Sequence, residues 1–196
     1  MYISGNRRSK EENTQTMEEE MRLSKFILGA TTVLLLAGTA NSWAQKHSIS
    51  YKNLAENTKY VQQHAIDVGD IPGHQVRINE IHYTYPTDPP VFEDVKVVEQ
   101  WNRGYSDYVD INGRHWGYVI YFLENGDKIF ARNEGSSQTV VNADGTKKST
   151  ATGVTLLTRG TGKFQGIQGL LRYVANFDPK AGLLEIRTEG TYWIEK

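Results

Sequence analysis

The chain has 196 residues, a net charge of −1 and no cysteine. This length allows one ordinary domain. The near-neutral charge excludes a basic nucleic-acid-binding protein and gives no attraction to an anionic membrane surface. Without thiols the protein has no disulfides, no thiol catalysis and no lipid attached through sulfur, so the stability of the domain must come from its core.

Residues 1–20 are polar and charged, without an apolar period. We expect them to be a disordered leader or an upstream extension of the reading frame. The true start then lies at Met1, Met17 or Met21, and this part of the chain contributes nothing to the fold.

Residues 21–44 have the layout of a secretory signal peptide. Arg22 and Lys25 precede an uninterrupted apolar run of about 15 residues, shorter than the ~20 that a membrane-spanning helix needs. Small residues, Ser42 and Ala44, then precede Gln45. We expect cleavage near Ala44-Gln45, export to the periplasm or medium of a bacterium, and no stable membrane anchor after cleavage.

The remaining residues, 45–196, read as one β domain. Runs rich in β-branched and aromatic residues alternate with turn signals, of which Asn125-Gly126 is the strongest for a hairpin. We expect a helical turn in Ser48–Thr58, and the spacing of the other runs predicts an antiparallel barrel or sandwich. The predicted strands are Tyr60–Val68, His74–Tyr85, Val95–Trp101, Trp116–Leu123, Lys128–Gly135, Ser149–Thr158, Leu170–Phe177 and Leu183–Glu195.

The glycine-rich stretch Leu156–Leu171 raises the question of a phosphate-binding loop. A Walker A loop needs glycine at position 157 and Ser or Thr after Lys163, but this chain has Leu157 and Phe164 there. The dinucleotide fingerprint fails as well, because its third glycine comes one position late, at Gly166. Glycines within β-rich sequence mark bulges, corners or close backbone approach, so we expect a barrel corner.

Three stretches together resemble a known group of proteins. They are WGYVIYFLENGDKIFARNEG (Trp116–Gly135), TLLTRGTGKFQGIQG (Thr155–Gly169) and GTYWIE (Gly190–Glu195). The pattern is similar to that of exported bacterial proteins of unknown function with an allene oxide cyclase-like or dirigent-like barrel, over roughly Val95 to Lys196. Arg159 stands where that group has glycine. The resemblance implies an all-β fold, a single antiparallel eight-stranded calycin-like (lipocalin-like) barrel, and assigns no catalytic residue.

Two strands carry weak candidates for acid–base chemistry, Glu80, His82 and Glu99. Alternation places Glu80 and His82 on the face of Val76 and Ile78. It likewise places Glu99 with Trp101 on the face of Val95 and Val97. If these faces line the lumen, each strand sends a carboxyl group into an apolar site, where its pKa rises and it can transfer protons. The favoured alternative puts the three candidates at the solvated rim, because a buried unpaired carboxylate is costly.

A ligand site is the second hypothesis, because concave apolar sites with a few polar groups bind ligands and an eight-stranded barrel can hold one small molecule. Tyr121 and Leu123 make the opposite face of the Trp116–Leu123 strand apolar too, which favours cover by a neighbouring subunit and so a homo-oligomer. The expected ligand-binding residues are Trp101, Trp116, Tyr118, Ile120 and Phe122.

None of the five histidines has a metal-ligand spacing, and no cofactor loop is present, so we expect no metal and no cofactor. Three functions remain open. The first, which we favour, is an exported barrel that binds a small hydrophobic ligand or acts as an interaction module. The second is a cyclase or isomerase acting on an apolar substrate, with Glu80 or Glu99 moving protons. The third is a structural protein with a filled barrel.

Overall fold

A computed structural model describes residues 45–178 and 182–195. The expected leader (1–20) and signal peptide (21–44) lie outside these residues. The described part contains no helix that is both long and apolar enough to span a bilayer. Its elements are β1 (His47–Leu54), the 3₁₀ helix η1 (Ala55–Asn57), β2 (Thr58–Asp67), β3 (His74–Thr84), β4 (Val91–Phe92), β5 (Val95–Val109), β6 (Asn112–Leu123), β7 (Lys128–Val141), β8 (Lys147–Gly160), the 3₁₀ helix η2 (Gly162–Phe164), β9 (Ile167–Asp178) and β10 (Gly182–Ile194).

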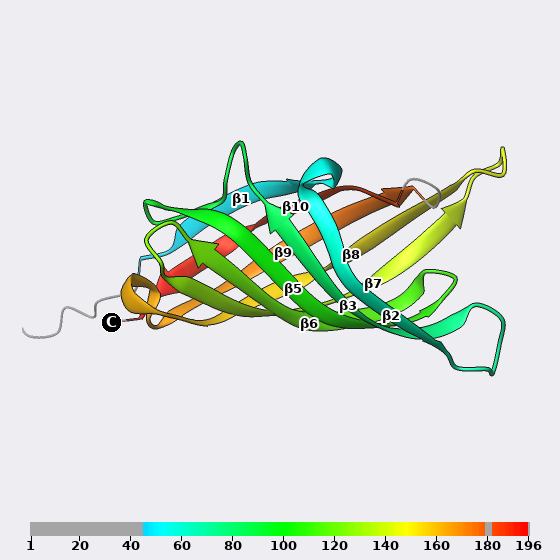
Figure 1. Cartoon of the computed structure of the whole chain (residues 1–196). Helices are drawn as coiled ribbons and strands as arrows, with labels where there is room; N and C mark the ends of the chain where they lie inside the picture. The colour runs from blue at the N-terminus through cyan, green and yellow to red at the C-terminus, as the bar shows by residue number, and fades with distance from the viewer. Residues whose placement is uncertain (1–44, 179–181, 196) are drawn as a thin grey trace, which may run out of the picture. The chain divides into compact units, whose positions relative to one another are not determined.

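The strands form one antiparallel sheet in the order β1-β10-β9-β8-β7-β6-β5-β3-β2 (Figure 1), and within the described residues β4 pairs only with β5. The predicted all-β antiparallel fold is confirmed. The sheet curls on itself, since Tyr51 on β1 bonds to Tyr121 on β6 although four strands separate them in the order. Its ends, β1 and β2, are not paired with each other. Instead β1 pairs with β10 and β2 pairs with β3, and the three residues of η1 join the two strands.

The eight predicted strands correspond to β2, β3 and β5–β10, and the sequence reasoning missed β1 and β4. The helical turn expected in Ser48–Thr58 is mostly wrong, because residues up to Leu54 are strand and only Ala55–Asn57 form a 3₁₀ turn. In β1 the buried residues Ile49, Tyr51 and Asn53 alternate with exposed polar ones. That alternation is typical of a half-buried strand. Because buried Asn53 is polar as well, the apolar pattern in the sequence is too weak to predict the strand.

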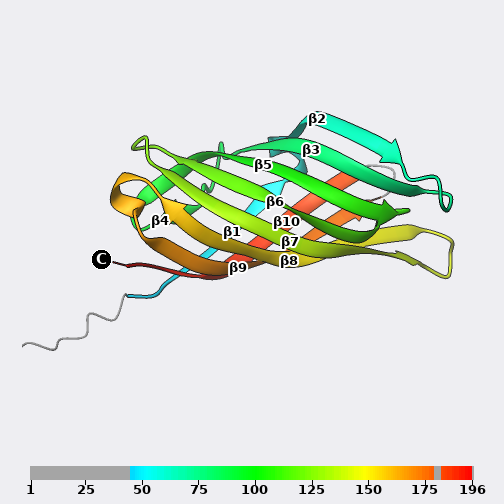
Figure 2. The same cartoon turned by 90° about the horizontal axis from the view of Figure 1, so that it is seen from below.

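The packed end of the interior contains η2 and β4 (Figure 2). Phe92 and Phe164 are fully buried there and pack edge to face, with ring centroids 6.4 Å apart. Other members of this core include Val97, Leu123 and Ile129. Because apolar side chains fill this half, the space for a ligand must lie in the other half, toward the β2–β3 and β7–β8 hairpins.

The glycine-rich stretch is a corner of this packed end and binds its own chain. Asp127 accepts hydrogen bonds from the Lys163 backbone N–H (3.2 Å) and the Thr161 hydroxyl (3.1 Å), so a carboxylate occupies the place a phosphate would need. Lys163 forms an ion pair with Asp94. Gly162 has a φ of +50°, and a side chain there would collide with the Asp127 carboxylate, which explains the glycine.

Candidate functional site

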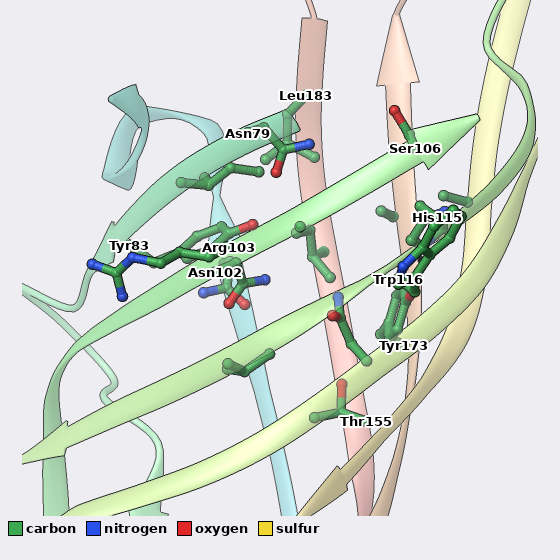
Figure 3. Close-up of a pocket in the computed structure, with 18 of the residues that line it drawn as sticks. Asn79, Tyr83, Asn102, Arg103, Ser106, His115, Trp116, Thr155, Tyr173 and Leu183 are labelled. Carbon is green, nitrogen blue, oxygen red and sulfur yellow. Dashed lines mark hydrogen bonds between the residues drawn. The ribbon is translucent and has the colours of Figure 1, made fainter. Parts of the chain in front are cut away.

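The open half of the interior contains a cavity of about 250 Å³ (Figure 3). Tyr51 and Tyr121 belong both to its lining and to the packed core, and the 2.9 Å hydrogen bond between their hydroxyls marks the boundary. Beyond it the inward residues become polar. The polar lining includes Arg77, Asn79, Gln100, Asn102, Ser106, His115, Asn133, Ser137 and Thr155. The lumen is therefore filled at one end and hollow at the other.

His115 on β6 lies between two tyrosines at the wall of this cavity. Its Nδ1 is 3.0 Å from the hydroxyl of Tyr108 on β5, and its Nε2 is 2.5 Å from the hydroxyl of Tyr173 on β9. Burial lowers the pKa of His115 below its usual value. A neutral imidazole donates from one nitrogen and accepts at the other, so one tyrosine donates to the ring and the other accepts from it.

Two glycines make room for this group. Gly135 on β7 and Gly153 on β8 face each other in the sheet. A Cβ atom on Gly135 would lie 2.5 Å from the Tyr173 hydroxyl and 2.8 Å from His115 Nε2, and one on Gly153 would lie 2.6 Å from the Tyr173 ring carbon Cζ. The close approach of Tyr173 to the sheet thus requires both positions to lack a side chain.

Arg77 on β3 brings a positive charge to the cavity. Its Nε and Nη2 both donate to Oε1 of Gln75, at 3.0 and 2.6 Å. Arg77 also lowers the pKa values of Tyr60 and Tyr108, although burial has the larger, opposite effect and raises both. Arg77, Tyr60 and Tyr108 all line this cavity.

Two buried polar atoms of β7, Asn133 Oδ1 and Ser137 Oγ, have no hydrogen-bond partner among the residues that the structure describes. Both residues line the cavity. Buried polar groups in folded proteins are nearly always paired with protein, water or a ligand. These atoms are therefore positions at which the cavity can bind a water molecule or a polar group of a ligand.

Glu80, His82 and Glu99 come together, but on the outer face of the sheet. Glu80 forms an ion pair with Arg103 (2.7 Å), and His82 Nε2 is 2.7 Å from Glu99 Oε2. The His82 ring stacks on Trp101 with centroids 4.2 Å apart. The less favoured of the two hypotheses, that these carboxyl groups enter an apolar lumen, is wrong, because they are paired with Arg103 and His82 on the outer face of the sheet.

Two features of the strands place Glu80, His82 and Glu99 on the outer face. On β3, Glu80 and His82 do share a face with Val76 and Ile78, but that face is the exposed one, with Ile78 53% exposed. On β5, a bulge between Val97 and Glu99 inserts Val98 as an extra residue. A bulge reverses the alternation beyond it, so Val95 and Val97 point inward while Glu99 and Trp101 point outward.

The aromatic face of β6 is likewise the outer one. Buried Val119, Tyr121 and Leu123 are the inward residues, whereas Tyr118 is 55% exposed and lies under the guanidinium of Arg132. Of the five expected ligand-binding residues, four do not line the cavity, so the prediction is wrong for Trp101, Tyr118, Ile120 and Phe122.

Trp116 is the exception in that set. It borders the cavity, although it is 47% exposed and its ring stacks on Tyr105. Strand alternation predicts which residues share a face, and burial in the folded protein decides which face is inside.

The sequence reasoning missed Arg77, His115 and Tyr173 as site residues. His115 is one of the five histidines without a metal-ligand spacing, and Tyr173 lies in the predicted strand Leu170–Phe177, so neither stands out in the sequence. The available signal was the Gly135 and Gly153 pair, since glycines within strands mark a close approach. No group of three or more histidine and carboxylate side chains that could hold a metal occurs within residues 45–178 and 182–195.

No protein-family model matches this chain, and no curated protein matches its sequence. Among solved structures, the chain is similar to that of the pterocarpan synthase dirigent protein PsPTS1, at 10% sequence identity and a TM-score of 0.42. The match covers 79% of this chain and 97% of that chain. At this identity and TM-score the likeness identifies neither a ligand nor an activity, and the resemblance to exported bacterial barrels stays a prediction.

Proposed function

We propose that this protein binds one small molecule in the hollow half of its β-barrel. The observation that carries the proposal is a cavity of about 250 Å³ with two buried polar atoms, Asn133 Oδ1 and Ser137 Oγ, that no group within residues 45–178 and 182–195 pairs with. A barrel built only for stability would gain by filling this half with apolar side chains, as it does around Phe164.

The lining supports a ligand with both apolar and polar parts. Tyr83, Tyr121 and Ile186 supply apolar surface, while Asn102 and His115 offer hydrogen bonds. Small-molecule sites combine apolar walls with a few placed polar groups in this way. The sequence predicts a small hydrophobic ligand, and the polar lining leads us to propose an amphipathic one.

We do not extend the proposal to a cyclase or isomerase that uses Glu80 or Glu99. Both carboxylates lie on the outer face of the sheet and are held by Arg103 and His82 respectively. Export of the protein, which the sequence of residues 21–44 favours, is part of the proposal, and so is a bacterial origin.

The test is native mass spectrometry of the protein purified without detergent, followed by solvent extraction. We expect a retained mass that is lost in the variant Ser137→Leu, whose side chain would occupy the cavity. The exposed outer-face variant Ser136→Leu is the matched control and should keep the ligand. The proposal would be refuted if the wild-type protein carried no ligand and the cavity showed only exchangeable water by NMR.

A further inference from the structure

We propose that the cavity takes a small organic anion, a monocarboxylate with a flat apolar body, and that Arg77 supplies its counter-charge. This inference rests on the proposed function, because it names the class of ligand for the same cavity.

The charge of Arg77 is not neutralised within the described residues. No Asp or Glu side chain of residues 45–178 and 182–195 forms an ion pair with it, and its only hydrogen-bond acceptor there is Gln75. A guanidinium has five N–H donors, and two are used on Gln75. The other arginine that borders the cavity, Arg103, is held by Glu80. Arg77 therefore keeps donors and a charge for a ligand.

The described part of the rest of the lining carries no negative charge that would repel an anion. Its described residues include no Asp and no Glu. The hydroxyl of Tyr60 has a proton to donate to an anion, and so has whichever of Tyr108 and Tyr173 accepts from His115. A carboxylate receiving hydrogen bonds from a guanidinium fork and neighbouring donors is bound more strongly than a neutral group.

The cavity limits the size of that anion. Its volume of about 250 Å³ is below the ~300–1,000 Å³ of pockets for drug-sized ligands. The apolar walls, with the rings of Tyr83 and Phe177 and the side chain of Ile81, suit one ring with a short side chain. A second carboxylate on the ligand would contact these apolar walls, where no unpaired cation of the described lining could bind it, because Arg103 is held by Glu80.

A matched pair of probes isolates the charge. 3-Phenylpropanoate and 3-phenylpropanamide have nearly the same shape, and only the first is an anion. We expect calorimetry at pH 7.5 to show the carboxylate binding the wild-type protein roughly tenfold or more tightly than the amide, since hydrogen bonds to charged groups are worth about 1.5–3 kcal/mol.

The variant Arg77→Gln should lose this preference and bind both probes as weakly as the wild type binds the amide. Unchanged amide binding would show that its cavity is intact. Arg132→Gln is the control, because Arg132 lies on the outer face over Tyr118, and it should behave as wild type.

Equal affinity for the two probes, a preference that survives in Arg77→Gln, or binding of neither probe would overturn the inference. The proposed function fails separately, when the native mass spectrum shows no retained molecule and NMR shows only exchangeable water in the cavity. A retained uncharged molecule would refute the anion while leaving the proposed function standing.

Discussion

Replacing Phe164 by alanine tests whether the glycine-rich stretch is a structural corner. Phe164 ends η2, is 0% exposed and packs edge to face on Phe92. Its ring is part of the core that fills one end of the barrel. The variant removes this ring and leaves a void among the side chains of the core, which can relax only in part because the strands that carry them are hydrogen-bonded in the sheet.

The expected loss in the free energy of unfolding is about 3–5 kcal/mol, the usual range for a buried Phe→Ala change. That is a large part of the ~5–15 kcal/mol that holds a typical domain folded. For a domain of this size, each kcal/mol lowers Tm by roughly 2–4 °C, so we expect a drop of about 6–20 °C.

Urea unfolding followed by circular dichroism measures the effect as a lower midpoint with an unchanged slope. Lys163→Ala is the matched control one residue away. Lys163 is exposed and forms a surface ion pair with Asp94, so its loss should barely move the midpoint. The reasoning fails if Phe164→Ala loses less than about 1 kcal/mol, well below the range for cavity-forming substitutions. It also fails if Lys163→Ala is the more damaging variant.

Two further predictions concern the cavity. The pKa of His115 in the folded protein lies below its usual 6.5 because of burial, so the unfolded chain binds this proton at higher pH. The free energy of unfolding should therefore fall as pH drops below about 6.5, and it should fall less steeply in His115→Gln. The pKa of His74 is raised by Asp107 and Asp70, but its contribution is the same in both proteins and cancels in the comparison. Urea unfolding at several pH values measures this, and an equal dependence on pH in the two proteins would contradict the prediction. Gly153→Ala should lower stability by about 1–3 kcal/mol by pushing Tyr173 out of place. A Tyr173 ring that keeps its NMR shifts and contacts to His115 in this variant would argue against the close approach.

Much of the fold could be predicted from the sequence. β-Branched and aromatic runs between turn signals predicted all but two of the strands, because strand propensity and turn chemistry are local properties. The hairpin at Asn125-Gly126 is where expected, and Gly126 has the positive φ of 87° that its turn needs. β1 was missed because buried Asn53 and the exposed polar residues dilute its apolar signal.

The candidate site could not be predicted in the same way. Alternation correctly grouped Glu80 with His82, but both faces of these strands carry apolar residues, so hydrophobicity did not show which face is inside. On β5 the single extra residue Val98 then reversed the alternation for Glu99. Bulges depend on how two strands pair, which the sequence of one strand does not reveal.

The sequence by itself determined the strands, the turns and the exclusion of thiol and Walker-loop chemistry, because each depends on residue type and short spacing. Only the tertiary structure decided that the barrel is filled around Phe164 and hollow around His115. It alone brought Arg77, His115 and Tyr173 to one cavity from β3, β6 and β9. Curling of the sheet brings together residues that lie far apart in the chain. The hydrogen bonds and burial that set their pKa values depend on these long-range contacts, which no local stretch of sequence reveals.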